Sequence, residues 1–131
     1  MAHAKKPLAV IPGAIRSDAF HFSLSLRSGG RSARVRFALD TGAFEMLLSQ
    51  RTAAALGLPN QGAVRVYGVT GHAAAYRSRV HVRIGSRLYR KVRCVVLPSM
   101  QTDQLFGLRF FIDNRLSFLL DPRRGTLSVY A

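Results

Sequence analysis

Alternation of apolar and polar residues runs along most of the chain and predicts β-structure. From Phe20 to Leu26 every second residue is apolar, and the same period returns over residues 35–39, after a glycine turn at residues 28–32. Because successive side chains of a strand point to opposite faces, each run predicts a half-buried strand. The two runs therefore form a predicted hairpin whose second arm ends at Asp40.

Strands and two short helices account for the rest of the pattern. Ser49 can cap a helix over residues 50–56, which Gly57 would end, and a second helical turn is expected over residues 108–114. Further strands or short apolar runs are expected over residues 45–49, 63–69, 73–84, 88–98, 105–107, 116–121 and 126–130. The fold class is therefore mostly β, with antiparallel strands and short helices.

Length and composition indicate one globular domain. The chain has 131 residues, 48% of them apolar, and no apolar run long enough to span a membrane. We expect an N-terminal tail over residues 1–14 and a domain over residues 15–131, without a signal peptide. Cys94 is the one cysteine, so an intrachain disulfide is excluded, and its neighbours predict a buried strand position. The chain is expected to be soluble, either cytoplasmic or the soluble part of a membrane-associated protein.

The net charge of +14 widens the choice of partners. It is typical of proteins that meet nucleic acid, an anionic membrane surface or an acidic polypeptide. Most of the cations are arginines, however, and a GC-rich genome produces the same excess. Arginines at residues 77, 79, 83 and 87 also alternate with apolar residues, as on the solvated face of an antiparallel sheet. Both interpretations stay open at this point.

A search for catalytic motifs leaves one acid. The sequence has no His or Cys pair at metal-ligand spacing, no nucleophile elbow and no phosphate loop, so we expect no metal and no cofactor. The four histidines are scattered and are expected to be surface or packing residues. Asp40 remains, at the end of an apolar strand, where Thr41 can form hydrogen bonds and Gly42 allows a tight turn.

The segment "ALDTGA", residues 38–43, resembles the active-site motif of retropepsin-like aspartic proteases, in the style of small bacterial members with one Asp-Thr-Gly per chain. The resemblance extends over residues 15–131. It includes the hairpin before the motif, "LLSQRTAAALGL" after it, the glycine-bearing tip "YGVTGH", "VRIGSRLYRKVRCVVLP", "LFGLRFF" and a C-terminal hairpin. It implies a retropepsin-like acid protease fold, with one lobe per chain.

The resemblance also implies the residues of a site. In the family the threonine bonds across a dimer axis, the glycine offers carbonyls to a polypeptide substrate, a glycine-bearing flap closes over it, and a second apolar-apolar-glycine segment passes behind the catalytic loop. The implied catalytic residues are Asp40, Thr41 and Gly42, and the implied substrate-binding residues are Ala43, Phe44, Glu45, Tyr67, Gly68, Val69, Thr70, Gly71, Leu105, Phe106 and Gly107.

The chain departs from the retroviral pattern at two positions. Family members usually carry an acid at the position of Phe44 and an arginine at that of Leu108, and the two form an ion pair. Both positions are apolar here. Since an apolar contact can replace a partly buried ion pair without loss of stability, we expect such a contact between Phe44 and Leu108.

Hydrolysis of a peptide bond by this chemistry needs two carboxylates that share a proton. The acids at residues 18, 103, 113 and 121 lie outside any second Asp-Thr-Gly. The sequence therefore predicts an aspartic endopeptidase in which a homodimer brings two copies of Asp40 together to activate a water. Two alternatives stay open: a non-catalytic binding or assembly module of the same fold, and a basic nucleic-acid-binding domain on the same scaffold.

Overall fold

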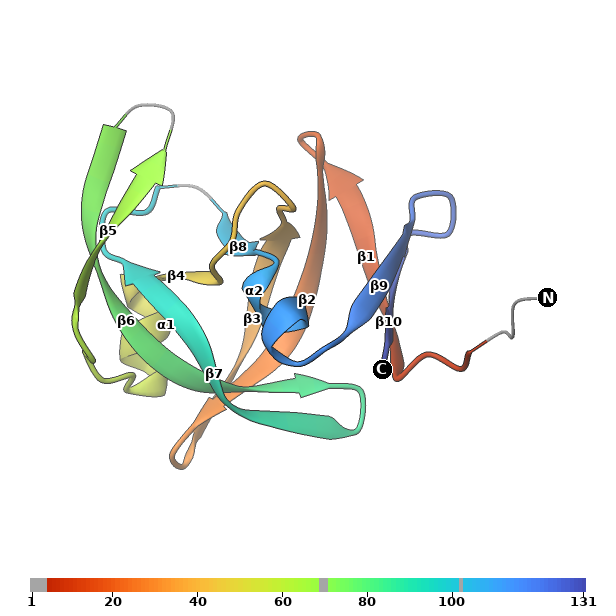
Figure 1. Cartoon of the computed structure of the whole chain (residues 1–131), viewed down its shortest axis with the longest axis horizontal. Helices are drawn as coiled ribbons and strands as arrows, with labels where there is room; N and C mark the ends of the chain where they lie inside the picture. The colour runs from red at the N-terminus through yellow and green to blue at the C-terminus, as the bar shows by residue number, and fades with distance from the viewer. Residues whose placement is uncertain (1–4, 69–70, 102) are drawn as a thin grey trace.

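The computed structural model of the chain describes residues 5–68, 71–101 and 103–131 (Figure 1). Within these residues the chain forms ten strands and two short helices. The strands are β1 (Ala9–Arg16), β2 (Ala19–Ser28), β3 (Arg31–Leu39), β4 (Leu47–Ser49), β5 (Ala63–Gly68), β6 (Gly71–Ile84), β7 (Arg87–Leu97), β8 (Gln104–Phe106), β9 (Ser117–Asp121) and β10 (Thr126–Tyr130). The helices are α1 (Gln50–Leu56) and α2 (Arg109–Asp113).

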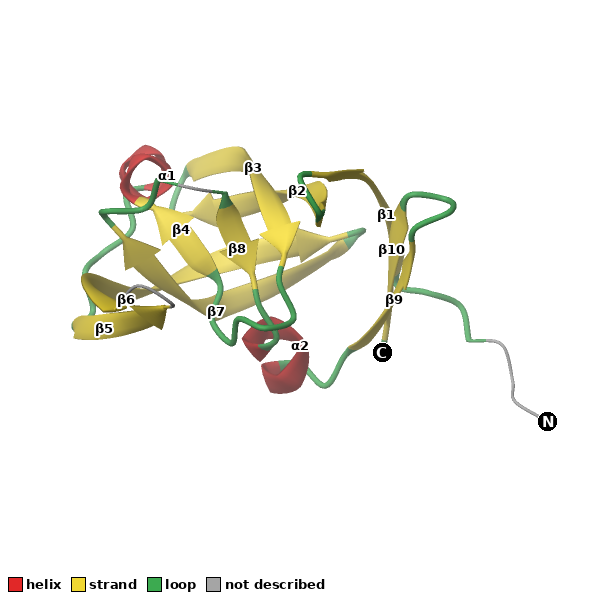
Figure 2. Cartoon of the chain, turned by 90° about the horizontal axis from the view of Figure 1, so that it is seen from above, coloured by secondary structure: helices red, strands yellow, loops and turns green. Residues whose placement is uncertain are grey.

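The sheet brings segments from distant parts of the sequence together around the end of β3. Its strand order is β5-β6-β7-β4-β8-β3-β2-β1-β10-β9, and β6 pairs with β2 as well, so the sheet curls back on itself. Strand β8 lies parallel to β3, and β4 lies between β7 and β8. Figure 2 shows α1 and α2 on opposite sides of the central strands β4 and β8. Residues just after β3 therefore meet residues just after β8.

Two apolar clusters stabilise this arrangement. The larger one contains a group of edge-to-face aromatic rings in which Phe106 contacts Phe22, Phe37, Phe110 and Phe111, at centroid separations of 5.2–5.6 Å. Such ring pairs add to the stabilisation from burial alone. The smaller cluster, on another part of the sheet, contains buried residues of β4, β6 and β7: Leu47, Ala75 and Val95.

Most of the predicted elements are present. Helix α1 has the expected bounds: the Ser49 hydroxyl accepts the Thr52 N–H (3.2 Å), and Gly57 adopts a left-handed φ of 65° at the end. Strand β10 also has the expected bounds, and most other boundaries differ by a few residues. On β6, Arg77 and Arg79 are exposed while Val80 and Val82 are buried, so the predicted solvated arginine face is confirmed for this strand.

The N-terminal region differs from the expectation. Residues 9–14, which were expected to lie in a tail, belong to β1. Residues 9–12 pair with β10, and residues 13–16 pair with β2, so the strand changes partner at the Pro12–Gly13 step. A proline followed by a glycine is typical of a chain break, and the segment lacks clear alternation, which is why the pattern missed it. The folded sheet therefore begins before residue 15.

Two further observations concern burial and membranes. Cys94 is buried at 1% exposure, as predicted, and burial raises the pKa of its thiol to about 12, so the thiol stays protonated at neutral pH. Neither helix of the described chain has the length and apolar character needed to cross a bilayer.

Candidate active-site cleft

The position of Asp40 is fixed by backbone hydrogen bonds at the end of β3. Its N–H donates to the carbonyl of Phe106 (3.1 Å), and its own carbonyl accepts the N–H of Ala43 (3.1 Å). The Gly42 N–H donates to Oδ1 of the Asp40 side chain (2.9 Å), so the carboxylate is held by the turn that it begins. The side chain is half-buried, whereas Thr41 and Gly42 are exposed.

The segment after β8 supports this loop from behind. The N–H groups of Leu108 and Arg109 donate to the carbonyls of Ala43 (3.1 Å) and Phe44 (2.7 Å). A Cβ atom at Gly107 would lie 2.5 Å from the Glu45 carbonyl oxygen and 2.7 Å from those of Ala43 and Phe44, so a side chain there would displace the loop. The passage of residues 105–107 behind the loop, which the resemblance implied, is therefore what the structure contains.

An ion pair is present beside the loop although Phe44 and Leu108 are both apolar. Nε of Arg109 lies 2.6 Å from Oε1 of Glu45, one residue after each position at which the family carries its charges. Both side chains are largely buried, with exposed fractions of 20% and 30%. The prediction that an apolar contact replaces the ion pair is therefore wrong. Phe44 instead lies beneath the Arg109 guanidinium, 4.4 Å from the ring centroid, in a cation–π contact.

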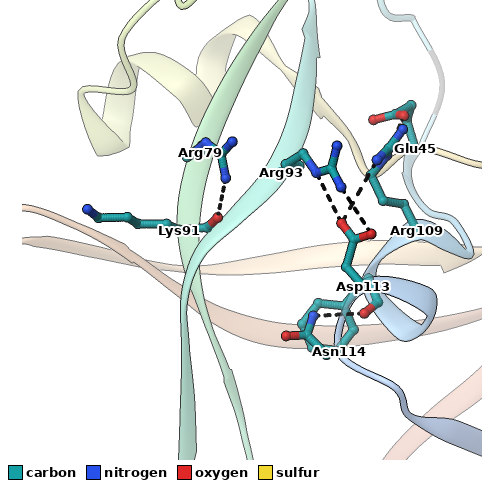
Figure 3. Close-up of polar contacts among 8 residues, drawn as sticks. Glu45, Arg79, Lys91, Arg93, Arg109, Asp113 and Asn114 are labelled. Carbon is teal, nitrogen blue, oxygen red and sulfur yellow. Dashed lines mark hydrogen bonds and ion pairs between the residues drawn. The ribbon is translucent and has the colours of Figure 1, made fainter.

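The ion pair continues into a network that joins the loop to α2 and β7 (Figure 3). Arg109 also approaches Asp113 (3.9 Å), and Arg93 donates two hydrogen bonds to the Asp113 carboxylate (3.1 and 3.2 Å). Charges thus alternate from Glu45 through Arg109 and Asp113 to Arg93. Two-pronged guanidinium–carboxylate contacts fix orientation as well as distance, so the network constrains how the catalytic loop sits on the sheet.

The loop opens into a cleft of about 930 Å³. On one side lie Asp40 and Gly42 with the three residues that follow them, and on the other side lie residues of β5. The β5 side includes Tyr67 and Gly68 of the predicted flap, and the Tyr67 side chain is 76% exposed. In Figure 1 the hairpin formed by β5 and β6 stands beside the loop that follows β3. The cleft thus lies between the expected catalytic loop and the expected flap.

Not every residue of the predicted site lines this cleft. Leu105 lines it, but Phe106 is 1% exposed in the aromatic core and Gly107 is covered by the catalytic loop, so these two support the site without facing it. Thr41 and Gly71 are exposed but lie outside the lining. The predicted residues Val69 and Thr70 lie outside the described residues.

Several lining residues were missed by sequence reasoning. The apolar ones include Leu47, Val64, Val66 and Val95, and the charged ones include Arg77 and Arg109. The alternation on β5 could have indicated Val64 and Val66 as residues of one face. The arginines carried no such indication, since an exposed face and a cleft wall have the same pattern. No cluster of three or more metal-ligating side chains occurs in the part of the chain that the structure describes.

Comparisons with known proteins agree with this geometry. The model of the family described as "gag-polyprotein putative aspartyl protease" matches residues 28–113. A retropepsin-like aspartic protease from Rickettsia conorii superposes with a TM-score of 0.60 at 20% identity, over 92% of this chain and 89% of that one. The EIAV protease in complex with the inhibitor HBY-793 gives a TM-score of 0.61 at 16% identity, over 79% and 95%. No curated protein matches the sequence.

Proposed function

The chain belongs to the retropepsin-like aspartic protease family, and we propose that it is an aspartic endopeptidase that acts as a homodimer. The observation that carries this proposal is the position of Asp40. Hydrogen bonds hold this residue at the end of β3, where it lines the cleft. A cleft of this size is within the usual range for ligand sites. An extended segment of polypeptide would lie in it between the catalytic loop and β5.

The proposed mechanism uses two copies of Asp40, one from each subunit. Two carboxyl groups held close together share a proton, since both cannot be ionised at such short range. The ionised group takes a proton from the attacking water, and the protonated group donates to the carbonyl oxygen of the peptide. A two-fold axis beside Asp40 meets this requirement with a single motif per chain.

Thr41 fits a role at that axis. Its side chain is exposed beside Asp40 and makes no hydrogen bond within residues 5–68, 71–101 and 103–131. Its hydroxyl is therefore available to bond with the second subunit and steady both loops. The hairpin of β5 and β6 would act as a flap that closes over the bound polypeptide and excludes bulk water.

Replacement of Asp40 by asparagine tests the chemistry. The amide has nearly the shape of the acid but cannot accept or give the proton, so kcat/KM on a denatured protein should fall by about 10²- to 10⁴-fold. Circular dichroism should show an unchanged fold. Asp18→Asn is the matched control, because Asp18 is exposed in the turn after β1. Equal cleavage by wild type and Asp40→Asn would contradict the proposal.

Mixing the two proteins tests the dimer. If each active centre needs both carboxyl groups, excess Asp40→Asn protein should capture wild-type subunits in inactive mixed dimers and lower the activity. Excess Asp18→Asn protein should not lower it. Activity that depends only on the amount of wild-type protein, whatever the excess of Asp40→Asn, would exclude the shared centre.

A further inference from the structure

The lining of the cleft is strongly basic. It contains Arg65 on β5, Arg77 and Arg79 on β6, Arg93 on β7 and Arg109 on α2. The acids in the lining are Asp40 and Glu45. Most of these arginines are exposed to solvent, and all five also border the space that the proposed function assigns to the substrate.

Two of the five arginines are neutralised within the chain, and three are not. Arg93 and Arg109 belong to the network with Asp113 and Glu45. All six acids of the sequence lie in the described part of the chain, and within that part no carboxylate comes within ion-pair distance of the other three arginines.

The three remaining arginines meet neutral groups only. The guanidinium of Arg65 donates to Nδ1 of His72 (2.8 Å), that of Arg77 to the carbonyl of Ala63 (3.3 Å), and that of Arg79 to the carbonyl of Lys91 (3.1 Å). Figure 3 shows the contact of Arg79 with the backbone at Lys91. Each guanidinium has further N–H donors, so these bonds leave donors available to a ligand.

The register of the sheet places two of these cations opposite each other. Arg79 on β6 lies directly opposite Arg93 on β7. Like charges at directly opposed positions of an antiparallel pair are destabilising. Packing does not require them, because both residues are exposed. The Asp113 carboxylate offsets the charge on the Arg93 side only, so a negatively charged ligand lying over β6 at Arg79 would offset the other charge and form charge-assisted hydrogen bonds.

The mixed basic and apolar lining of the cleft favours a ligand that carries a carboxylate on an aliphatic stem. Arg77 lies opposite the buried Val95, and Leu47, Val64 and Val66 provide further apolar surface in the lining. A polynucleotide is less suited to the same space, since its phosphates are not carried on an aliphatic stem that these apolar residues could contact. Glutamate and aspartate side chains combine a short apolar stem with a single charge.

We propose that the cleft selects polypeptides with Asp or Glu near the cleavage site, and that Arg77 and Arg79 bind the acidic side chain. The inference rests on the proposed function, since it names the substrate class of the same cleft. A second hollow, of about 270 Å³, shares Arg79 and Arg93 with the cleft and is also lined by Arg90, Lys91 and one acid, Asp113. Its four cations outnumber that acid, so it would favour substrates with more than one acid.

The test uses pairs of peptides that are identical except for Glu or Gln at one position, moved along either side of the scissile bond. Wild type should cleave the best Glu peptide with a kcat/KM about tenfold above that of its Gln partner, as expected for one charge-assisted contact. Arg77→Gln and Arg79→Gln should each reduce this ratio, and Arg79→Glu should favour a Lys peptide instead. Arg87→Gln, exposed on β7 outside the lining, is the control and should keep the ratio.

Binding to the Asp40→Asn protein separates this inference from the proposed function, because it requires no cleavage. That protein should bind a fluorescent Glu peptide more tightly than the Gln peptide, and the difference should shrink as salt is added. It should also shrink as pH falls through about 4.3, where the peptide glutamate takes up a proton and loses its charge.

Three results would overturn the inference: equal binding of Glu and Gln peptides, a preference that survives in the double variant Arg77→Gln/Arg79→Gln, or tighter binding of a single-stranded oligonucleotide than of the Glu peptide. A preference in binding with no cleavage by wild type would refute the proposed function while supporting the recognition of acidic side chains by these arginines.

Discussion

The two walls of the cleft are constructed in different ways. The catalytic loop is held by hydrogen bonds from residues 106–109, by its own turn and by the ion pair of Glu45 with Arg109. The outer half of the hairpin of β5 and β6 is held by fewer partners. Within the described residues β5 pairs with β6 alone, and β6 pairs with β7 only from residue 76 onward. The end of the hairpin is exposed, with Tyr67 and Gly68 open to solvent.

This difference separates two tasks. A carboxylate that must meet a second carboxylate at short range needs a fixed position, and an error of about 1 Å can cost on the order of a hundredfold in rate. A segment that admits and covers a polypeptide must instead open and close, so it is drawn from the less strongly held parts of a fold. Substitutions in the two walls should therefore have different effects.

Apart from replacement of Asp40 itself, the largest effect is expected from Gly107→Ala, which disturbs the support of the catalytic loop. The new Cβ would overlap three backbone carbonyl oxygens, which have little freedom to move, so we expect a loss of about 3 kcal/mol in unfolding free energy. The displaced loop should also lower kcat/KM by about a hundredfold. Urea unfolding and initial rates at matched folded fraction measure the two effects.

Gly30→Ala is the control for this change. A Cβ atom at Gly30 would have open space around it, with no neighbouring atom within 4 Å, and Gly30 has no positive φ. Its replacement should therefore leave stability and rate nearly unchanged. If Gly107→Ala were as mild as Gly30→Ala, the close passage behind the loop would not be what fixes Asp40.

The sequence was sufficient for those parts of the fold that local rules determine. The capped helix α1 and the alternating strands follow from the chemistry of single segments, and the position of Asp40 follows from the end of an alternating run. Strand β1 did not follow, because its Pro12–Gly13 step is stabilised by two different partners, β10 and β2, that lie on either side of it in the sheet. Strand β1 therefore forms because of its pairing with separate segments of the chain, which its own sequence does not indicate.

The same contrast holds for the site: its local motif could be predicted from the sequence, and its contacts between separate segments could not. The motif located Asp40 and its turn, but the ion pair was expected to be replaced by an apolar contact. Glu45 and Arg109 are brought together through the packing of α2 against the loop, which the sequence pattern does not show. The pattern also could not predict that arginines line the cleft. Alternation shows that Arg77 and Arg79 share an exposed face, and only the fold shows that this face borders the cleft.

A smaller effect is expected from Arg109→Met, which keeps the aliphatic stem and removes the charge. It leaves the largely buried Glu45 carboxylate without its partner, at a cost of about 1–3 kcal/mol, and removes the cation over Phe44. We expect a several-fold loss of kcat/KM, because the loop loses one restraint while its backbone hydrogen bonds remain. Thermal or urea unfolding and peptide cleavage measure both quantities.

The double variant Glu45→Gln/Arg109→Met shows whether the pair acts as a unit. Removing both charges avoids an unpaired buried carboxylate, so the double variant should be more stable than Arg109→Met alone. Additive losses from the two single changes would mean that the ion pair does not couple α2 to the catalytic loop.

The smallest effect is expected in the flap, from Gly71→Ala. Gly71 has a φ of 126°, which side-chain-bearing residues rarely adopt, whereas Gly68, its partner across the hairpin, has no such requirement. Strain of about 1–2 kcal/mol should reshape the end of the hairpin. Since this end is exposed and pairs only with itself, global stability should change little and KM should rise a few-fold. Gly68→Ala is the matched control, and an equal rise in KM from both changes would show that the flap depends on small residues rather than on the backbone angle at Gly71.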